Sequence, residues 1–110
     1  MNKLDGEQTL MRIIVGESDR WQHRPLHEAL VELFRQEGFS GATVLRGVAG
    51  FGASSLVHTD QLLSLSHDLP LVIEVVDSAE KIDSILPRLD EMLQGGLVTL
   101  EKARVIRYGK

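Results

Sequence analysis

The chain has 110 residues, of which 43% are hydrophobic and 25% are charged, and its formal net charge is -4. This length and composition predict one globular domain with a modest core. The acidic balance argues against nucleic-acid binding, which needs a basic face. The lack of cysteine excludes disulfides, thiolate metal sites and thiol catalysis. No apolar run approaches the roughly 20 residues of a membrane span, and the polar start does not resemble a signal peptide, so we expect a cytoplasmic protein without membrane insertion.

The first part of the chain predicts a strand followed by a helix. We expect residues 1–8 to form a disordered polar tail and residues 9–110 to form the single domain. Residues 9–15 are apolar and β-branched and end at a glycine, which predicts a strand. Pro25 is well placed as the first residue of a helix, whose apolar positions recur every three or four residues until Gly38.

The middle of the chain predicts two further strands. Residues 42–48 are the second predicted strand, and a long polar loop follows over about residues 50–67. Residues 71–76 are the third predicted strand. Asp77, with Glu80 three residues later, resembles a capping box and predicts the start of a second helix.

The last part of the chain predicts the second helix and two short strands. Pro87 lies inside this helix and removes one backbone hydrogen bond, so we expect a kink or a break there. Gly95 and Gly96 end the helix. Residues 97–100 and 103–108 are two short strand candidates. The order β-α-β-β-α-β with an extra C-terminal strand favours an α+β ferredoxin-like sandwich, in which both helices cover one face of an antiparallel sheet.

The alternation of the strands predicts an oligomer. Each strand has one uncharged face and one apolar face with a single central charge, which is Arg12, Arg46 or Glu74. The helices can cover only one face, and the other is too apolar to remain in water. In the ferredoxin-like order the third strand lies between the first and the second, so we expect Glu74 between Arg12 and Arg46 in the interior of a homo-oligomer.

Gly47, Gly50 and Gly52 follow the second predicted strand and have two interpretations. They allow a bulge and a tight turn, or they form a loop that offers backbone amides to a ligand phosphate or a partner. The segment is neither a Walker motif nor a dinucleotide fingerprint, because no Gly-Lys-Ser/Thr follows and the glycines do not open a helix.

The histidines leave a metal-binding alternative open. His58 and nearby Asp60 are the ligands that a metal-binding or metal-tolerance trimer would use, although the histidine spacing shows no convergent set. No nucleophile, base and orienting group can be assembled from the sequence, so we expect no enzyme. A small hydrolase using the His58 loop is the remaining alternative.

Several motifs resemble the domain-of-unknown-function family 190, a small, mostly prokaryotic and PII-like family. The resemblance implies a ferredoxin-like fold that assembles as a homotrimer and places nucleotides in clefts between neighbouring subunits. It covers nearly the whole chain after the tail. The motifs are Ile14-Val15-Gly16-Glu17, Gly41-Ala42-Thr43-Val44-Leu45-Arg46-Gly47, Gly50-Phe51-Gly52, His58-Thr59 and Leu69-Pro70-Leu71-Val72-Ile73-Glu74.

The resemblance also assigns roles to residues. It implies that the loop at 50–67 is the counterpart of the mobile PII signalling loop and that Gly95-Gly96 lies in the second loop lining the cleft. Arg107, in Ile106-Arg107-Tyr108-Gly109, takes the position of a phosphate-contacting arginine. The chain departs from PII at Val105, where PII has a second arginine, and the tyrosine-bearing modification site has no match.

Together these points predict a trimeric sensor that binds a small anionic metabolite and signals through the 50–67 loop. The resemblance implies an adenine nucleotide as the regulatory ligand and a membrane transporter or an enzyme as the regulated partner. We expect no resident metal, because the histidine spacing shows no convergent set of ligands. The expected ligand-binding residues are Gly47, Gly50, Phe51, Gly52, Ser54, His58, Gly95, Gly96 and Arg107.

Overall fold

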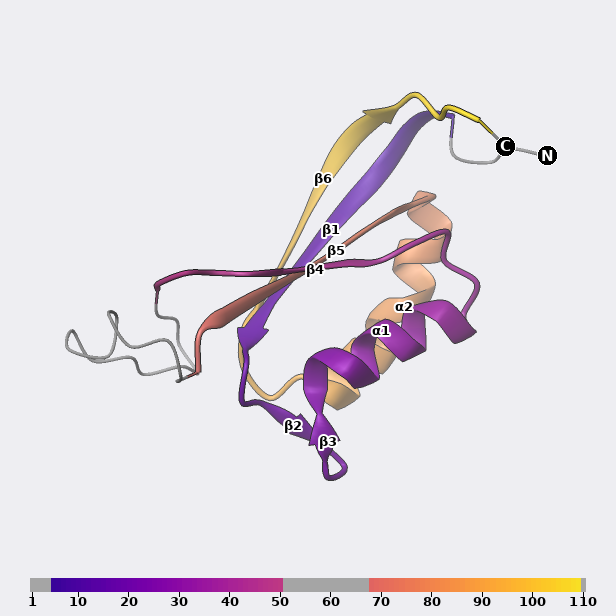
Figure 1. Ribbon diagram of the computed structural model, residues 1–110. Coiled ribbons are helices and arrows are strands. Elements are labelled where there is room, and N and C mark those ends of the chain that lie inside the picture. The colour runs from indigo at the N-terminus through magenta and orange to yellow at the C-terminus, as the bar shows by residue number, and fades with distance from the viewer. Residues whose placement is uncertain (1–4, 51–67, 110) are drawn as a thin grey trace.

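A computed structural model describes residues 5–50 and 68–109. Two helices cover one face of a four-stranded sheet whose strand order is β4-β5-β1-β6, with every neighbouring pair antiparallel (Figure 1). In this order β5 lies between β1 and β4, as the ferredoxin-like prediction requires. The strands of this sheet are β1 (Gly6–Gly16), β4 (Thr43–Arg46), β5 (Pro70–Asp77) and β6 (Leu97–Val105).

The core lies between the sheet and the helices α1 (Leu26–Gln36) and α2 (Ala79–Met92). Alternate residues of β1 and β5 point into it, and the apolar stripes of both helices close it from the other side. Its largest fully buried side chains are Phe34, Met11, Ile13, Leu30, Ile73, Ile82, Ile85 and Val75. Among the described residues, no helix is long and apolar enough to cross a bilayer.

The predicted bounds of the first and last strands are wrong. β1 begins at Gly6 rather than at residue 9, because residues 6–8 pair with residues 103–105 of β6. The two C-terminal strand candidates are one strand, so the extra strand is absent from the described residues. Glu101 does not interrupt β6, since it lies opposite Leu10 and its carboxylate reaches Arg12. β1 and β6 continue together beyond the helices toward the termini (Figure 1).

The helix ends also differ from the expectation. Ser78, and not Asp77, caps α2: its hydroxyl accepts a hydrogen bond from the backbone N–H of Lys81 at 3.2 Å. Asp77 is the last residue of β5, and Pro25 is the residue before α1 rather than the first residue in it. The predicted break at Pro87 is absent, because α2 continues through it with buried residues on both sides.

A small hairpin between β1 and α1 was not anticipated. It pairs β2 (Arg20–Trp21) with β3 (Arg24–Pro25) through Gln22 and His23. Both turn residues have positive φ, at 50° and 71°, as the tight type I′ hairpin turn requires. Glycine or asparagine normally occupies such positions, so the sequence carried no turn signal there.

Candidate functional site

Gly47 and Gly50 pack against the ring of Pro70 at the end of the sheet. The N–H of Gly47 donates to the carbonyl of Pro70 at 2.7 Å, and a Cβ atom on Gly47 would lie 2.8 Å from Pro70 Cγ. Gly50 has a φ of 150° and its Cβ would lie 3.1 Å from the same ring. Close backbone approach therefore accounts for both glycines, and the Gly47 amide is already engaged. We call residues 46–50 and 68–70 the stem.

The end of β1 contacts both segments of the stem, residues 46–50 and residues 68–70. The N–H of Glu17 donates to the carbonyl of Leu69 at 2.8 Å, and the carboxylate of Glu17 pairs with Arg46 at 3.1 Å. The N–H of Ser18 donates to the carboxylate of Asp68 at 2.9 Å. Glu17 and Ser18 thus tie the stem to the point where β1 leaves the sheet.

The expected position of Arg46 beside Glu74 is wrong. In the sheet register Thr43 lies opposite Glu74, whereas Arg46 lies opposite Leu71, whose side chain is buried under the helices. Arg46 therefore shares the helix side of the sheet and pairs with Glu17. The cause is the apolar character of both alternations in residues 42–48, because a shift of one residue in such a strand exchanges its faces.

Arg12 is the centre of a charge cluster on the opposite side of the sheet. Its guanidinium pairs with Glu74 at 2.8 Å, as expected, and also with Glu101 at 2.8 Å. The hydrogen bonds that Arg12 donates to Glu74, and then to Glu101, raise the pKa of Arg12, because both carboxylates favour its charged form. Glu101 joins this cluster because β6 is one continuous strand next to β1.

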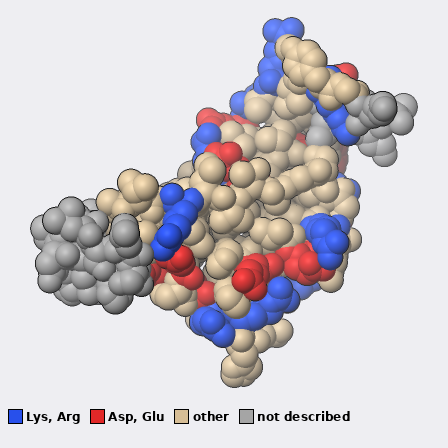
Figure 2. Space-filling model, viewed as in Figure 1, with Lys and Arg blue, Asp and Glu red and all other residues tan. Residues whose placement is uncertain are grey.

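The sheet face away from the helices, which we call the open face, is mainly apolar around this cluster. The register places Leu45, Val72, Ile14 and Leu97 in one row across all strands of the sheet. Leu45 is 48% exposed and Leu97 is 56% exposed. Figure 2 shows the molecule from the side of β4 and the helices, where an uncharged area in the middle is bordered by charged side chains of both signs. Within one chain nothing described covers the open face (Figure 1).

A cavity of about 280 Å³ lies where the β2–β3 hairpin meets the end of α2. Gly95, which the sequence placed in the site, lines it together with Asp19 and Arg20. Arg20 was missed because its position depends on the unanticipated hairpin, where its guanidinium donates to the His23 carbonyl at 2.7 Å. The remaining lining residues are Leu26, Met92 and Gln94, so the cavity has apolar and polar walls.

Gly96, next to this cavity, packs against β1. Its φ is 90°, in the left-handed region, and a Cβ atom there would collide with the carbonyl oxygen of Ile14. Ile14 lies opposite Val72, two residues along β5 from Pro70, so the Gly95-Gly96 loop and the stem glycines occupy the same end of the sheet. The structure therefore brings the two predicted glycine segments to one end of the molecule.

Arg107 lies at the other end. It follows β6, and its backbone N–H donates to the carboxylate of Asp5 at 3.2 Å. Gly96 precedes β6, which has nine residues. At about 3.3 Å per residue, a strand of this length separates its two ends by roughly 30 Å. Within one chain, Arg107 and the glycines do not form one site.

The other expected ligand residues, Phe51, Gly52, Ser54 and His58, lie outside the described residues, as does Asp60 of the metal-binding alternative. In the part of the chain that the structure describes, no three His, Asp or Glu side chains cluster as a metal site would require.

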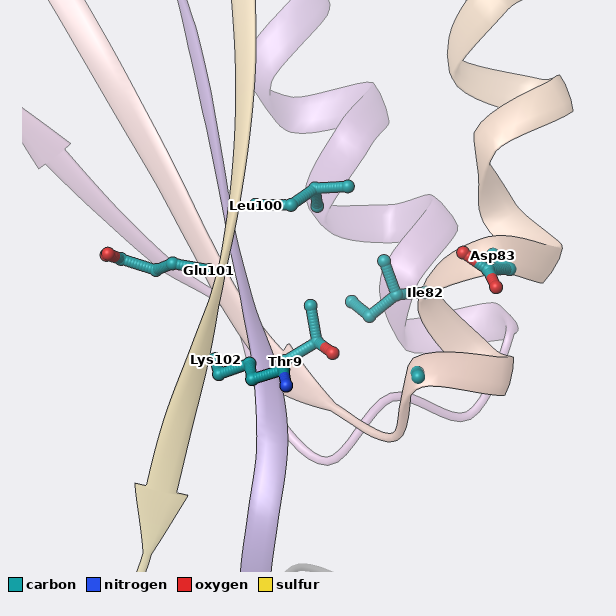
Figure 3. Close-up of a pocket in the computed structure, with 7 residues that line it drawn as sticks. Thr9, Ile82, Asp83, Leu100, Glu101 and Lys102 are labelled. Atoms are coloured by element: carbon teal, nitrogen blue, oxygen red, sulfur yellow. The ribbon is translucent and has the colours of Figure 1, made fainter.

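A second hollow, of about 260 Å³, lies between β6 and α2. Figure 3 shows Leu100 of β6 and Ile82 of α2 pointing toward each other across it, with Thr9 beside them, whereas Glu101 points to the other side of β6. Its lining includes the charged residues Asp83, Glu101 and Lys102. None of the expected site residues lines this hollow.

Comparison with known proteins supports the resemblance seen in the sequence. The family model DUF190, described as "Uncharacterized ACR", matches residues 8–105. A UPF0166 protein of Aquifex aeolicus is 34% identical over 100 residues, which cover 91% of this chain and 94% of that protein. A UPF0166 protein of Methanocaldococcus jannaschii is 31% identical over 99 residues, covering 89% and 91%.

Solved structures share the fold. A putative PII-like signalling protein from Thermus thermophilus aligns with a TM-score of 0.64 at 21% identity, covering 92% of this chain and 91% of that one. CPII from Thiomonas intermedia, bound to ADP, AMP and acetate, aligns with a TM-score of 0.66 at 16% identity, covering 93% and 91%. Both the ferredoxin-like fold and the likeness to PII-like proteins are therefore confirmed.

Proposed function

The chain belongs to the DUF190 family, and from this premise we propose that it is a PII-like sensor, a homotrimer that binds an adenine nucleotide between subunits and signals to a partner protein through the 50–67 loop. The observation that carries the proposal is the meeting of the stem and the Gly95-Gly96 loop at one end of a PII-like sheet. A structural neighbour with this fold was solved with ADP and AMP bound.

The open face supports assembly. Leu45, Val72, Ile14 and Leu97 form an apolar row that the helices of the same chain do not cover. A contiguous apolar surface of this kind is typical of a protein–protein interface. Packing copies of this face against one another would bury the row together with the Arg12–Glu74 pair, which the proposal places in the interior of the trimer.

The distance between Arg107 and the glycines supports a site shared by two subunits. One chain contributes the stem and the Gly95-Gly96 loop at one end of its sheet, whereas Arg107 lies beyond the far end of β6. A neighbouring copy can bring its own Arg107 to the glycines of the first. In this arrangement the guanidinium would bind the phosphates of the nucleotide, for which its fork of donors is well suited.

The test is nucleotide binding by calorimetry, combined with native mass spectrometry to count subunits. We expect trimers, binding of ADP or AMP, and an affinity that falls about 10–100-fold in Arg107→Ala, the range for one charged hydrogen-bonding contact. Arg35→Ala, an exposed arginine on α1, is the matched control and should bind normally. No binding of either nucleotide at millimolar concentration would contradict the proposal.

A regulated partner completes the proposed function. A ligand that changes the loop at 50–67 presents a partner protein, such as a transporter or an enzyme, with two distinguishable surfaces. A pull-down with nucleotide-loaded and nucleotide-free protein tests this step. A partner that binds equally well in both conditions would show that the nucleotide does not control the interaction.

A further inference from the structure

Residues 16–20, which we call the junction turn, connect the end of β1 to the β2–β3 hairpin. Asp19 is held firmly within it. Its carboxylate accepts a hydrogen bond from the N–H of Gly16 at 3.0 Å, and its own N–H donates to the Gly16 carbonyl at 3.1 Å. Its carbonyl accepts from the N–H of Leu26, at the start of α1, at 2.8 Å. Asp19 thus joins β1 to α1.

The first half of the junction turn contacts both segments of the stem. Glu17 pairs with Arg46 in the first segment and donates its N–H to the carbonyl of Leu69 in the second. Ser18 donates its N–H to the carboxylate of Asp68, also in the second segment. The stem is therefore positioned by Glu17 and Ser18, in addition to the bond between Gly47 and Pro70.

The second half of the junction turn lines the cavity beside Gly95. Asp19 and Arg20 form part of its wall. Residue 18 precedes residue 19 directly in the chain, and reciprocal hydrogen bonds join Gly16 to Asp19 across the turn, so the two halves are linked both covalently and by hydrogen bonds. One element therefore contacts both the cavity and the stem.

We propose that the junction turn couples the cavity to the stem, so that a nucleotide phosphate or another anion engaging Arg20 in the cavity changes the position of residues 46–50. This proposal rests on the proposed function in one respect, the binding of an anionic ligand beside Gly95. It adds the route by which occupancy is transmitted and names Asp19 as the positioning residue.

Coupling has a measurable consequence in both directions. If a ligand in the cavity changes the stem, a change in the stem alters the affinity of the ligand by the same factor. Loss of the Ser18–Asp68 hydrogen bond in Asp68→Ala should therefore change the affinity for ADP, by about fivefold or more for a typical coupling. If the turn is only a structural connection, this variant should bind ADP as the parent protein does.

The experiment combines a spin label on the stem with a substitution in the wall of the cavity. The chain has no cysteine, so Val48→Cys introduces a single thiol for a spin label at a side chain that is 86% exposed. In this background Asp19→Ala removes the carboxylate that accepts from Gly16. Asp90→Ala, at an exposed position of α2, removes a carboxylate of equal charge and is the matched control.

Without any ligand, we expect Asp19→Ala to increase the mobility of the label, with Asp90→Ala unchanged. Equal spectra for the two variants would overturn the proposal. If Asp19→Ala does not fold, Arg20→Ala replaces it, because this change leaves the backbone hydrogen bonds of the turn in place. Label mobility in Arg20→Ala should then respond to ADP less than in the parent, and an equal response would overturn the proposal.

The ligand arm separates this proposal from the proposed function. ADP that binds by calorimetry but leaves the spectrum of the parent label unchanged would overturn the coupling and leave nucleotide binding intact. Absence of ADP binding would contradict the proposed function. In that case the comparison of Asp19→Ala with Asp90→Ala still decides whether the turn couples the cavity wall to the stem.

Discussion

The two faces of the sheet are built from the same strands and differ in what they do. On the helix side, Met11, Ile13 and Ile73 are fully buried and form the core with α1 and α2. On the open face, the next residues along these strands form a half-exposed apolar row and the Arg12 cluster. One alternation of each strand therefore stabilises the fold, while the other remains available for assembly.

The largest expected effect separates two adjacent isoleucines. Ile13→Ala creates a cavity in the core and should lower the free energy of unfolding by about 2–5 kcal/mol, the usual range for such a truncation. Ile14→Ala, on the open face, should affect the subunit count more than the stability of the single chain. Urea unfolding at one fixed protein concentration measures the free energy of unfolding, and native mass spectrometry measures the subunit count. Equal losses of stability in both variants would break the comparison between the faces.

A smaller effect is expected where the Gly95-Gly96 loop crosses β1. Gly96→Ala would place a Cβ against the Ile14 carbonyl with a φ of 90° and should destabilise the protein by roughly 1–3 kcal/mol. Gly41→Ala is the control, because no atom lies near its Cβ and its φ is ordinary. Thermal unfolding compares the two. A Gly96→Ala protein as stable as Gly41→Ala would show that the loop can move away from β1.

A third prediction uses two exposed leucines of β6 that belong to different faces. Leu97 lies in the apolar row of the open face, whereas Leu100 lies opposite Met11 on the helix side. Leu97→Glu should dissociate the proposed trimer, because it places a charge in the buried interface. Leu100→Glu should leave the subunit count unchanged. Native mass spectrometry of both variants is the measurement, and a trimer that survives Leu97→Glu would move the interface away from this row.

The smallest effect is expected at Arg12. Glu74 and Glu101 raise the pKa of Arg12, so the charged guanidinium contributes stability at every pH below its ordinary value and loses this contribution only as the pH rises above the raised pKa. Titration of Arg12 therefore contributes no pH dependence between pH 6 and 9. The stability difference between the parent and Arg12→Gln should stay constant over that range in denaturant titrations. A difference that changes within it would show that another group controls the cluster.

The loop at 50–67 contains most of the ligand-binding residues expected from the sequence. His58, Ser54, Phe51 and Gly52 remain predictions, because they lie outside the described residues. Gly47 and Gly50 also remain predictions as ligand-binding residues, and their contact with Pro70 accounts for the absence of a side chain at both. Arg20 and Asp19 enter the site only through the three-dimensional structure.

Local patterns in the sequence were sufficient for the two helices, the long strands and their ferredoxin-like order. The spacing of apolar residues along a helix or a strand indicates which side of the element faces the core. Ile13 and Leu30 could therefore be assigned to the core from the sequence alone. The pairing of Arg12 with Glu74 followed from the same logic, because both strands carry one charge at the centre of the apolar alternation.

The faces of β4, the continuity of β6, the hairpin before α1 and the partner of Arg46 became known only from the three-dimensional structure. Each depends on register or on a turn without a sequence signature, and register is set by contacts between strands that lie far apart in the chain. Both alternations of residues 42–48 are mainly apolar, so the sequence was enough to predict a strand there but left open which of its sides faces the helices.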